Sequence, residues 1–473
     1  MINMKTIMLG VGCAVLLVVA GCGGGGDEAE PPGGCEFPDS GMSGAVTVTP
    51  GSPVTFEEVE GEAQNTMDFE YDGQLAPAVI GALRYGPCGD AGLLLRVGDQ
   101  LVFVDPASGG TPQVVDDNGD AYRSASLFFD ADCEPLVIRS ASSEGYMEYT
   151  RDGADSWDVT IVLDDISSII GSDPSSLSQV ASDVGADGRL YVFSQAGWGP
   201  DSRLIRGGRD AAAGSAWSFE ELPMPQAEPD LIFGFWVDGS GATHTVYRET
   251  RYPCDPCETD SLHAVLTDGG SSWSATVVQP GLWGDPHDEF LRAASLAFDS
   301  AGNPFIAGHF ARHVVTGSYK SAELRIYGWK QDAWCAEVVE DATDGYAGSD
   351  GSNYTGADPR LVIDGEGYFH VLWRDQSIWH AGGDENEIRG QLRYAVRSGS
   401  TWYKKTLLEQ QGQTESANPL FGLTAPLLAV SPDGEEAVAA AVVFSWETDS
   451  IYNDMEAPVT YTARAVTATV DAI

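Results

Sequence analysis

The sequence is poor in basic residues. Lys and Arg together number 25 among 473 residues, against 71 Asp and Glu, which gives a formal net charge of −46. A field of this sign repels nucleic-acid backbones and anionic membrane surfaces. We therefore expect no nucleic-acid partner, and membrane contact only where the chain carries an anchor of its own.

The sequence also lacks the short motifs that mark common catalytic sites. It contains no G-x-S-x-G, no H-E-x-x-H and no phosphate-binding glycine loop. A glycosidase built from carboxylates on separate segments stays open, because spacing in the sequence does not constrain such a pair. The absences favour a binding protein over an enzyme.

No apolar run is long enough to cross a bilayer, which needs roughly 20 residues as a helix. The longest begins after Lys5, runs from Ile7 to Ala20 and ends in Leu17-Val-Val-Ala-Gly21-Cys22. This is the pattern of an export signal, and its ending resembles the lipobox of bacterial lipoproteins. The resemblance implies cleavage before Cys22 and a lipid on its sulfur. By the same resemblance, Gly23 at the next position favours anchoring in the outer membrane. We expect a signal peptide over 1–21, a lipidated and flexible tether over 22–43, and a folded domain over 44–473.

One unit repeats along the folded domain. A short strand, a tight turn, further strands and a Trp recur, with equivalent turn positions at 130, 185, 238, 299, 364 and 431; three of them, 238, 299 and 364, have the form Asp-x-x-Gly. Successive turns lie 55, 53, 61, 65 and 67 residues apart. Strand meanders at this period indicate a radial array of small sheets. We predict an all-β, seven-bladed β-propeller, with six or eight blades as alternatives, closed by an N-terminal strand at Val54–Val59.

Two third-to-fourth-strand turns carry a resemblance to a known family. Thr150-Arg-Asp152-Gly-Ala-Asp-Ser156-Trp157 and Thr267-Asp268-Gly-Gly270-Ser-Ser272-Trp273 resemble the Asp-box of sialidase-like propellers. In that family the Asp caps the hairpin and the Trp packs between blades. We therefore expect equivalent packing roles for the tryptophans at 157, 217, 273, 334 and 402. The same resemblance makes a sialidase-like glycoside hydrolase the alternative to a binding module.

Few cysteines remain after export. Cys88 and Cys133 occupy the same turn of adjacent repeats, so we predict a disulfide between neighbouring blades. Cys254 and Cys257 frame a short loop that closes a second disulfide or binds a metal. Asp116-Asp-Asn118-Gly-Asp120 resembles the start of a Ca²⁺ loop without its later ligands, so Ca²⁺ is possible and no other cofactor is indicated.

Cationic side chains recur at equivalent positions beside the long, irregular loops. Counting seven residues past the turn glycine gives Arg248, His309 and Arg374, and counting seven before the turn Asp gives Arg123 and Arg292. Arg forks suit carboxylate, phosphate or sulfate, and neighbouring aromatics such as Trp373 suit sugar rings. The alternative is that each Arg is paired locally with an acid. We predict a monomeric cell-surface module that binds an anionic or carbohydrate ligand, or a protein partner, at these residues.

Overall fold

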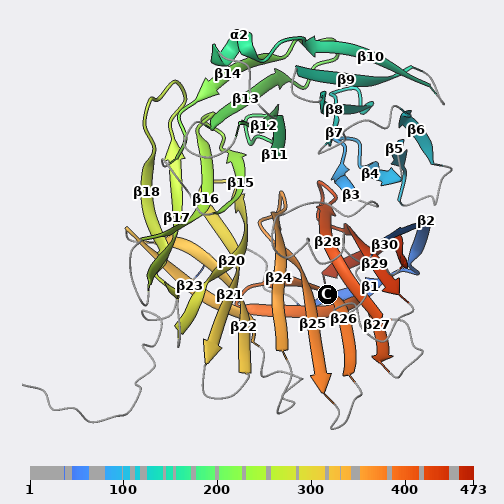
Figure 1. Cartoon of the computed structure of the whole chain (residues 1–473), viewed down its shortest axis with the longest axis vertical. Helices are drawn as coiled ribbons and strands as arrows, with labels where there is room; N and C mark the ends of the chain where they lie inside the picture. The colour runs from blue at the N-terminus through green and yellow to red at the C-terminus, as the bar shows by residue number, and fades with distance from the viewer. Residues whose placement is uncertain are drawn as a thin grey trace, which may run out of the picture. The chain divides into compact units, whose positions relative to one another are not determined.

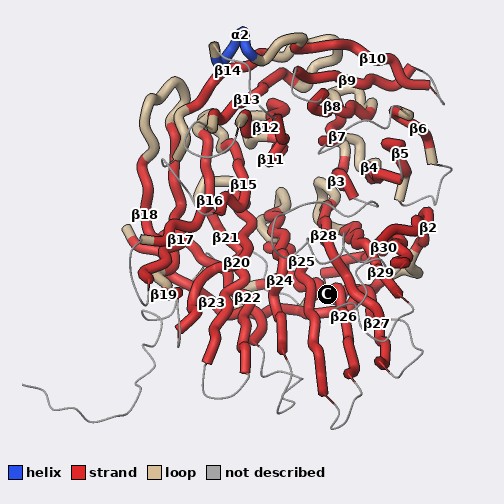
Figure 2. Tube along the Cα trace, in the orientation of Figure 1, coloured by secondary structure: helices blue, strands red, loops and turns tan. Residues whose placement is uncertain are grey.

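The computed structural model describes most of the predicted folded domain. The residues described are 37, 45–62, 80–97, 100–106, 112–117, 125–141, 145–152, 156–171, 177–197, 202–225, 231–251, 257–283, 287–314, 319–330, 332–341, 352–380, 386–414, 420–446 and 458–472. Within them, strands dominate and one short helix occurs, α2 (Ser167–Ile170) (Figure 2). None of the helical structure described there is long and apolar enough to cross a membrane.

The strands form seven small antiparallel sheets in a ring, so the fold is the predicted seven-bladed β-propeller (Figure 1). Blade 1 contains β3 (Ile80–Tyr85), β4 (Ala91–Val97), β5 (Gln100–Val104) and β6 (Gln113–Asp116). Blade 2 contains β7 (Ala125–Phe129), β8 (Pro135–Ala141), β9 (Gly145–Asp152) and β10 (Ser156–Leu163). Blade 3 contains β11 (Leu177–Val184), β12 (Arg189–Ala196), β13 (Arg203–Asp210) and β14 (Ser218–Leu222).

The remaining blades follow the same plan. Blade 4 contains β15 (Leu231–Val237), β16 (Thr243–Thr250), β17 (Cys257–Leu266) and β18 (Ser274–Gln279). Blade 5 contains β20 (His287–Phe298), β21 (Pro304–Val314), β22 (Tyr319–Lys330) and β23 (Ala333–Asp341). Blade 6 contains β24 (Ser352–Ile363), β25 (Phe369–His380), β26 (Asn386–Ser398) and β27 (Thr401–Thr414). The short β19 (Leu282–Trp283) pairs with both β17 and β20 and so links blades 4 and 5.

Blade 7 closes the ring with strands from both ends of the chain. It contains β28 (Leu420–Val430), β29 (Glu436–Trp446) and β30 (Pro458–Ala472), and β30 takes two N-terminal strands on its free edge. β1 (Val46–Pro50) pairs with one half of β30 and β2 (Val54–Glu62) with the other half. The predicted closing segment Val54–Val59 therefore lies in β2, and β1 extends the closure beyond the prediction. Pairing along β30 covers an edge that would otherwise be open to another chain.

The turns between first and second strands explain why the repeat folds as it does. Asp299 shows the arrangement: its Oδ1 accepts the backbone N–H groups of Ala301 and Asn303 at 2.9 and 2.8 Å. The same two bonds, to residues two and four positions on, recur at Asp130, Asp238 and Asp364. The residue after the bend has positive φ and is Gly in most blades, but in blade 2 it is Cys133, with φ 67°. Cys133 is bonded to Cys88 with 6.0 Å between Cα atoms, which confirms the predicted disulfide.

The tryptophans of the repeat lie between blades, as predicted. Trp273 packs on a cluster that joins blades 3 and 4, and Trp402 on one that joins blades 5 and 6. In four cases the indole Nε1–H donates to the preceding blade: Trp217 to Glu148, Trp273 to the Pro223 carbonyl, Trp334 to Thr276 and Trp402 to Glu337. Of the five, only Trp334 is fully buried, and the other four are half-buried.

This connectivity gives the ring two different faces. The turns that join first to second strands, such as Asp299–Asn303, share one face, which we call the turn face. The other ends of the second strands reach the opposite face, which we call the loop face. Arg248 lies near that end of β16, whereas His309 and Arg374 lie midway along β21 and β25. These cationic residues therefore all lie away from the turn face.

Candidate functional site

Four of the predicted cationic residues lie on the inner two strands of blades 4 to 6. Arg248 is on β16, Arg292 on β20, His309 on β21 and Arg374 on β25. Arg292 occupies a bulge in β20, where pairing moves from Leu291–Phe310 to Ala293–His309. A bulge bends a strand and re-aims its side chain, so Arg292 departs from the regular alternation of β20.

Two of the guanidinium groups share one aromatic ring. The Arg248 Cζ lies 5.0 Å from the centre of the Phe290 ring, and the Arg292 Cζ lies 5.6 Å from it. Phe290 itself is buried, with 7% of its surface exposed. Each contact is within the range of a cation–π interaction, worth about 0.5–1 kcal/mol at exposed sites and more where water is excluded. The aromatic side chain of Phe290 thus holds the two guanidinium groups near each other and does not neutralise the charge of either.

His309 lies beside Arg292, because its strand partner is the next residue, Ala293. It is 4% exposed, and its Nε2 has no hydrogen-bond partner among the described residues. Burial, together with the positive charges of Arg292 and Arg374, lowers the pKa of His309 to about 3, while Asp358 acts in the opposite direction. The imidazole is therefore neutral at physiological pH and presents a polar nitrogen that the described protein does not satisfy.

Arg374 forms the best-defined ion pair of the cluster. Its Nη2 lies 3.1 Å from Asp358 Oδ2, whose side chain is 38% exposed. Asp358 is in an irregular part of β24 and has φ 49°, a left-handed conformation that non-glycine residues seldom adopt. Backbone strain of this kind concentrates at functional sites. For Arg374 the alternative of local pairing with an acid is thus correct in part.

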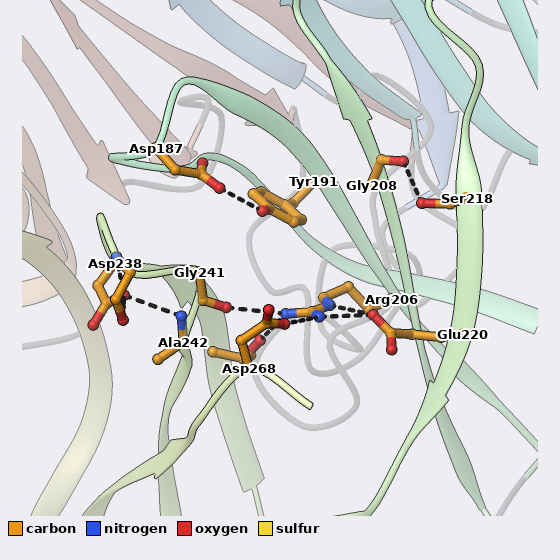
Figure 3. Close-up of polar contacts among 12 residues, drawn as sticks. Asp187, Tyr191, Arg206, Gly208, Ser218, Glu220, Asp238, Gly241, Ala242 and Asp268 are labelled. Atoms are coloured by element: carbon orange, nitrogen blue, oxygen red, sulfur yellow. Dashed lines mark hydrogen bonds and ion pairs between the residues drawn. The ribbon is translucent and has the colours of Figure 1, made fainter. Parts of the chain in front are cut away.

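Arg206 shows how an arginine with a purely structural role is held in this protein. Its guanidinium contacts Glu220 at 2.7 Å and Asp268 at 3.0 Å, and it donates to the Gly241 carbonyl at 3.2 Å (Figure 3). These contacts join blade 3 to the turns of blade 4. In the structure Asp268, expected to cap its own hairpin, instead reaches Arg206 of the preceding blade.

Arg292 differs from Arg206 in its surroundings. Within the described residues, its contacts are the Phe290 ring and the electrostatic interaction with His309, and no carboxylate lies at ion-pair distance. In a chain with 71 acidic residues, a partly buried guanidinium without a carboxylate is unusual. The arrangement leaves the donor groups of Arg292 available to an anion from outside the chain.

One predicted site residue must be corrected. Trp373 is fully buried and belongs to the hydrophobic cluster between blades 5 and 6. Trp373 and Arg374 are consecutive in β25, and consecutive strand residues face opposite sides of a sheet. Trp373 is therefore a core residue and offers no surface to a ligand that contacts Arg374.

Several other predicted site residues are not among the residues that the structure describes. Arg123, Cys22 and Cys254 are not among the described residues, and only the backbone of Cys257, the first residue of β17, is described. In the segment that resembles the start of a Ca²⁺ loop, Asp116 contacts Arg139 at 2.8 Å and accepts a hydrogen bond from Tyr149. In the described part of the chain, no three His, Cys, Asp or Glu side chains are grouped so as to hold a metal ion.

Sequence reasoning missed three members of the site: Phe290, Asp358 and Arg360. Arg360 is on β24, donates to the Pro359 carbonyl at 3.1 Å, and has its pKa lowered by burial, with Asp358 acting in the opposite direction. Pro359 follows directly on Asp358, in the stretch where β24 loses its regular pairing with β25. Irregular strand pairing cannot be predicted from the positions of a repeat. The only signal in the sequence for this site was the even spacing of Arg248, His309 and Arg374 from their turns.

No known protein family matches the sequence, and no curated protein is detectably similar to it. Solved structures of similar fold include the polysaccharide lyase Uly1, with 10% identity and a TM-score of 0.47 over 88% of this chain and 99% of that one. They also include an ulvan lyase, at 10% identity and a TM-score of 0.43 over 80% and 95%. An α-L-arabinofuranosidase from Fusarium graminearum has 10% identity and a TM-score of 0.34 over 60% and 92%. At such identities these likenesses show the fold alone.

Proposed function

We propose that the chain is an exported, lipid-anchored β-propeller that binds an anionic carbohydrate on its loop face. The observation that carries the proposal is Arg292, whose guanidinium lies over Phe290 with no carboxylate at ion-pair distance among the described residues. His309 adds a buried nitrogen without a partner, next to the same arginine. Together they form a place where an anion gains charge-assisted hydrogen bonds that the protein itself does not supply.

Charge selects the kind of partner. The formal net charge of the chain is −46, so an anion can bind only where the local electrostatic potential is positive. Arg248, Arg292 and Arg374 supply that positive potential, and Asp358 forms an ion pair with Arg374. We expect a monomer that recognises a small charged group displayed on a glycan, since a long polyanion would meet repulsion beyond these residues.

Binding is favoured over glycoside hydrolysis at this face. Hydrolysis requires two carboxyl groups about 5–10 Å apart across the sugar. In the described structure Asp358 is engaged in an ion pair with Arg374. No motif of the sequence assigns a second carboxylate to work with it, which is why binding remains the proposal.

A glycan array combined with a turnover screen tests the proposal. The full chain, purified in detergent, is expected to retain carboxylated or sulfated glycans and to ignore their neutral counterparts, with no release of product. Arg248→Ala and Arg374→Ala are expected to weaken retention. Turnover of a glycoside, or equal retention of neutral glycans, would contradict the proposal.

The anchor has a separate test. Labelled palmitate is expected on the wild-type protein and not on Cys22→Ala, because the lipid is attached to that sulfur. Fractionation should then place the wild-type protein with the outer membrane. Label that persists in Cys22→Ala would show that the lipobox resemblance is misleading.

A further inference from the structure

We propose that the anionic group of the ligand has a hydroxyl on a neighbouring carbon, as in a sugar acid, with the acid group held by Arg292 and the hydroxyl by His309. This inference rests on the proposed anion-binding function and narrows the class of ligand. It is carried by the hydrogen-bonding state of His309.

The Nε2 atom of His309 is buried and has no partner in the described structure. A buried polar atom without a hydrogen bond destabilises a protein by about 1–3 kcal/mol, so such atoms are rare and usually have a reason. The imidazole is neutral, so each ring nitrogen either donates or accepts, depending on the tautomer. Both tautomers leave Nε2 unsatisfied until something binds it.

The protein groups around His309 do not complete this bond. Arg292 and Arg374, the two positive charges that act on His309, carry only donors. An ionised carboxylate or sulfate carries only acceptors. It can accept hydrogen bonds from the arginines, but it can bond to Nε2 only in the neutral tautomer that has its proton on Nε2. A hydroxyl both donates and accepts, so it satisfies Nε2 in either tautomer.

The positions of the two residues fit one small ligand. His309 pairs directly with Ala293, the residue after Arg292, so the two side chains arise from adjacent positions on neighbouring strands. Paired strands lie about 4.8 Å apart. An acid group and the hydroxyl on the next carbon of a sugar ring are close enough for one small ligand to contact both side chains. A uronic acid is the simplest sugar with both groups.

The test compares methyl glucuronoside with its 4-deoxy analogue, which lacks the hydroxyl next to the carboxyl-bearing carbon, by calorimetry on the full chain. We expect the wild-type protein to bind the 4-deoxy analogue about tenfold more weakly, the effect of one lost hydrogen bond. In His309→Leu the two forms should bind alike. The control is Gln195→Ala, which changes the equivalent position of blade 3 and should keep the tenfold difference.

The outcomes separate this inference from the proposed function. Equal binding of both glucuronosides by the wild-type protein would overturn the role of the hydroxyl and leave anion binding intact. Binding of a sulfated monosaccharide but not of the glucuronoside would overturn the assignment of a sugar acid. Failure to bind any anionic glycan would overturn the proposed function as well. The wild-type comparison needs no variant, so it remains decisive if His309→Leu does not fold.

Discussion

Trp402 of blade 6 donates its indole Nε1–H to Glu337 of blade 5 at 2.6 Å. The same carboxylate lies 3.3 Å from Arg397 of blade 6, so one outer-strand acid receives two groups from the next blade. Related indole bonds from Trp217, Trp273 and Trp334 reach the preceding blade in the same direction. The repeated Trp is thus a directional link around the ring as well as an apolar packing residue.

Replacing this indole should weaken the ring without affecting the loop face. Trp402→Ala is expected to lower the free energy of unfolding by about 3–5 kcal/mol, and Trp402→Phe by about 1–2 kcal/mol through loss of the hydrogen bond. Urea unfolding measures both. The control is Trp329→Ala, which removes a tryptophan that is 37% exposed and should cost less. Equal losses at 402 and 329 would show that the link is not structural.

Cys133 allows the effect of the turn backbone to be measured apart from the disulfide. Its φ of 67° is a glycine conformation, and glycine occupies the equivalent place in other blades. Both double variants, Cys88→Ala/Cys133→Ala and Cys88→Ala/Cys133→Gly, lose the bond and about 2–5 kcal/mol. The glycine form should retain about 1 kcal/mol more, because only alanine is strained there. A more stable alanine form would contradict this account.

Acid should destabilise blade 4 through a pair of buried histidines. The His263 and His244 rings are joined by a 2.9 Å hydrogen bond, and His244 Nε2 lies 3.1 Å from Asp238. Burial and the neighbouring His244 lower the pKa of His263 to about 3, below its ordinary value of 6.5. The folded state therefore binds a proton less readily than the unfolded state, so stability is complete above pH 6.5 and falls as the pH drops towards 3.

His263→Gln tests this dependence. The amide can still donate to His244, and it does not titrate. The slope of unfolding free energy against pH between 6 and 4 should decrease by up to about 1.4 kcal/mol per pH unit relative to the wild-type protein. An unchanged slope would show that other groups, such as Asp238, control the acid sensitivity.

The fold could be predicted because its signals are local. In blades 4 to 6 an Asp that accepts two backbone N–H groups and a Gly with positive φ define the turn within five residues, as Asp299 and Gly302 show. The repetition of such turns predicted seven blades, with six or eight as alternatives. The first part of the closure, β1, was not predicted because Val46–Pro50 has no turn of its own and becomes a strand only by pairing with β30.

Only those residues of the site that recur at a fixed spacing from the turns could be predicted from the sequence. Equal spacing from the turns placed His309 and Arg374 at equivalent points of β21 and β25, and in the structure Arg292 and Arg374 both act electrostatically on His309. It could not reveal that Phe290 supports two guanidinium groups, because the bulge at Arg292 depends on pairing with the next strand. Trp373 was misassigned for the opposite reason, since alternation along β25 turns it away from Arg374.

The central claim is that Arg292 binds an anion, and one titration tests it most directly. The affinity of the full chain for carboxylated and sulfated oligosaccharides is measured for the wild-type protein, Arg292→Gln and Arg189→Gln. Arg189 is a matched arginine at the turn-face end of β12, already paired with Asp210 at 3.0 Å. We expect Arg292→Gln to bind at least about tenfold more weakly, as for a lost charge-assisted hydrogen bond, and Arg189→Gln to bind like the wild-type protein. Equal affinity of Arg292→Gln and the wild-type protein would contradict the account.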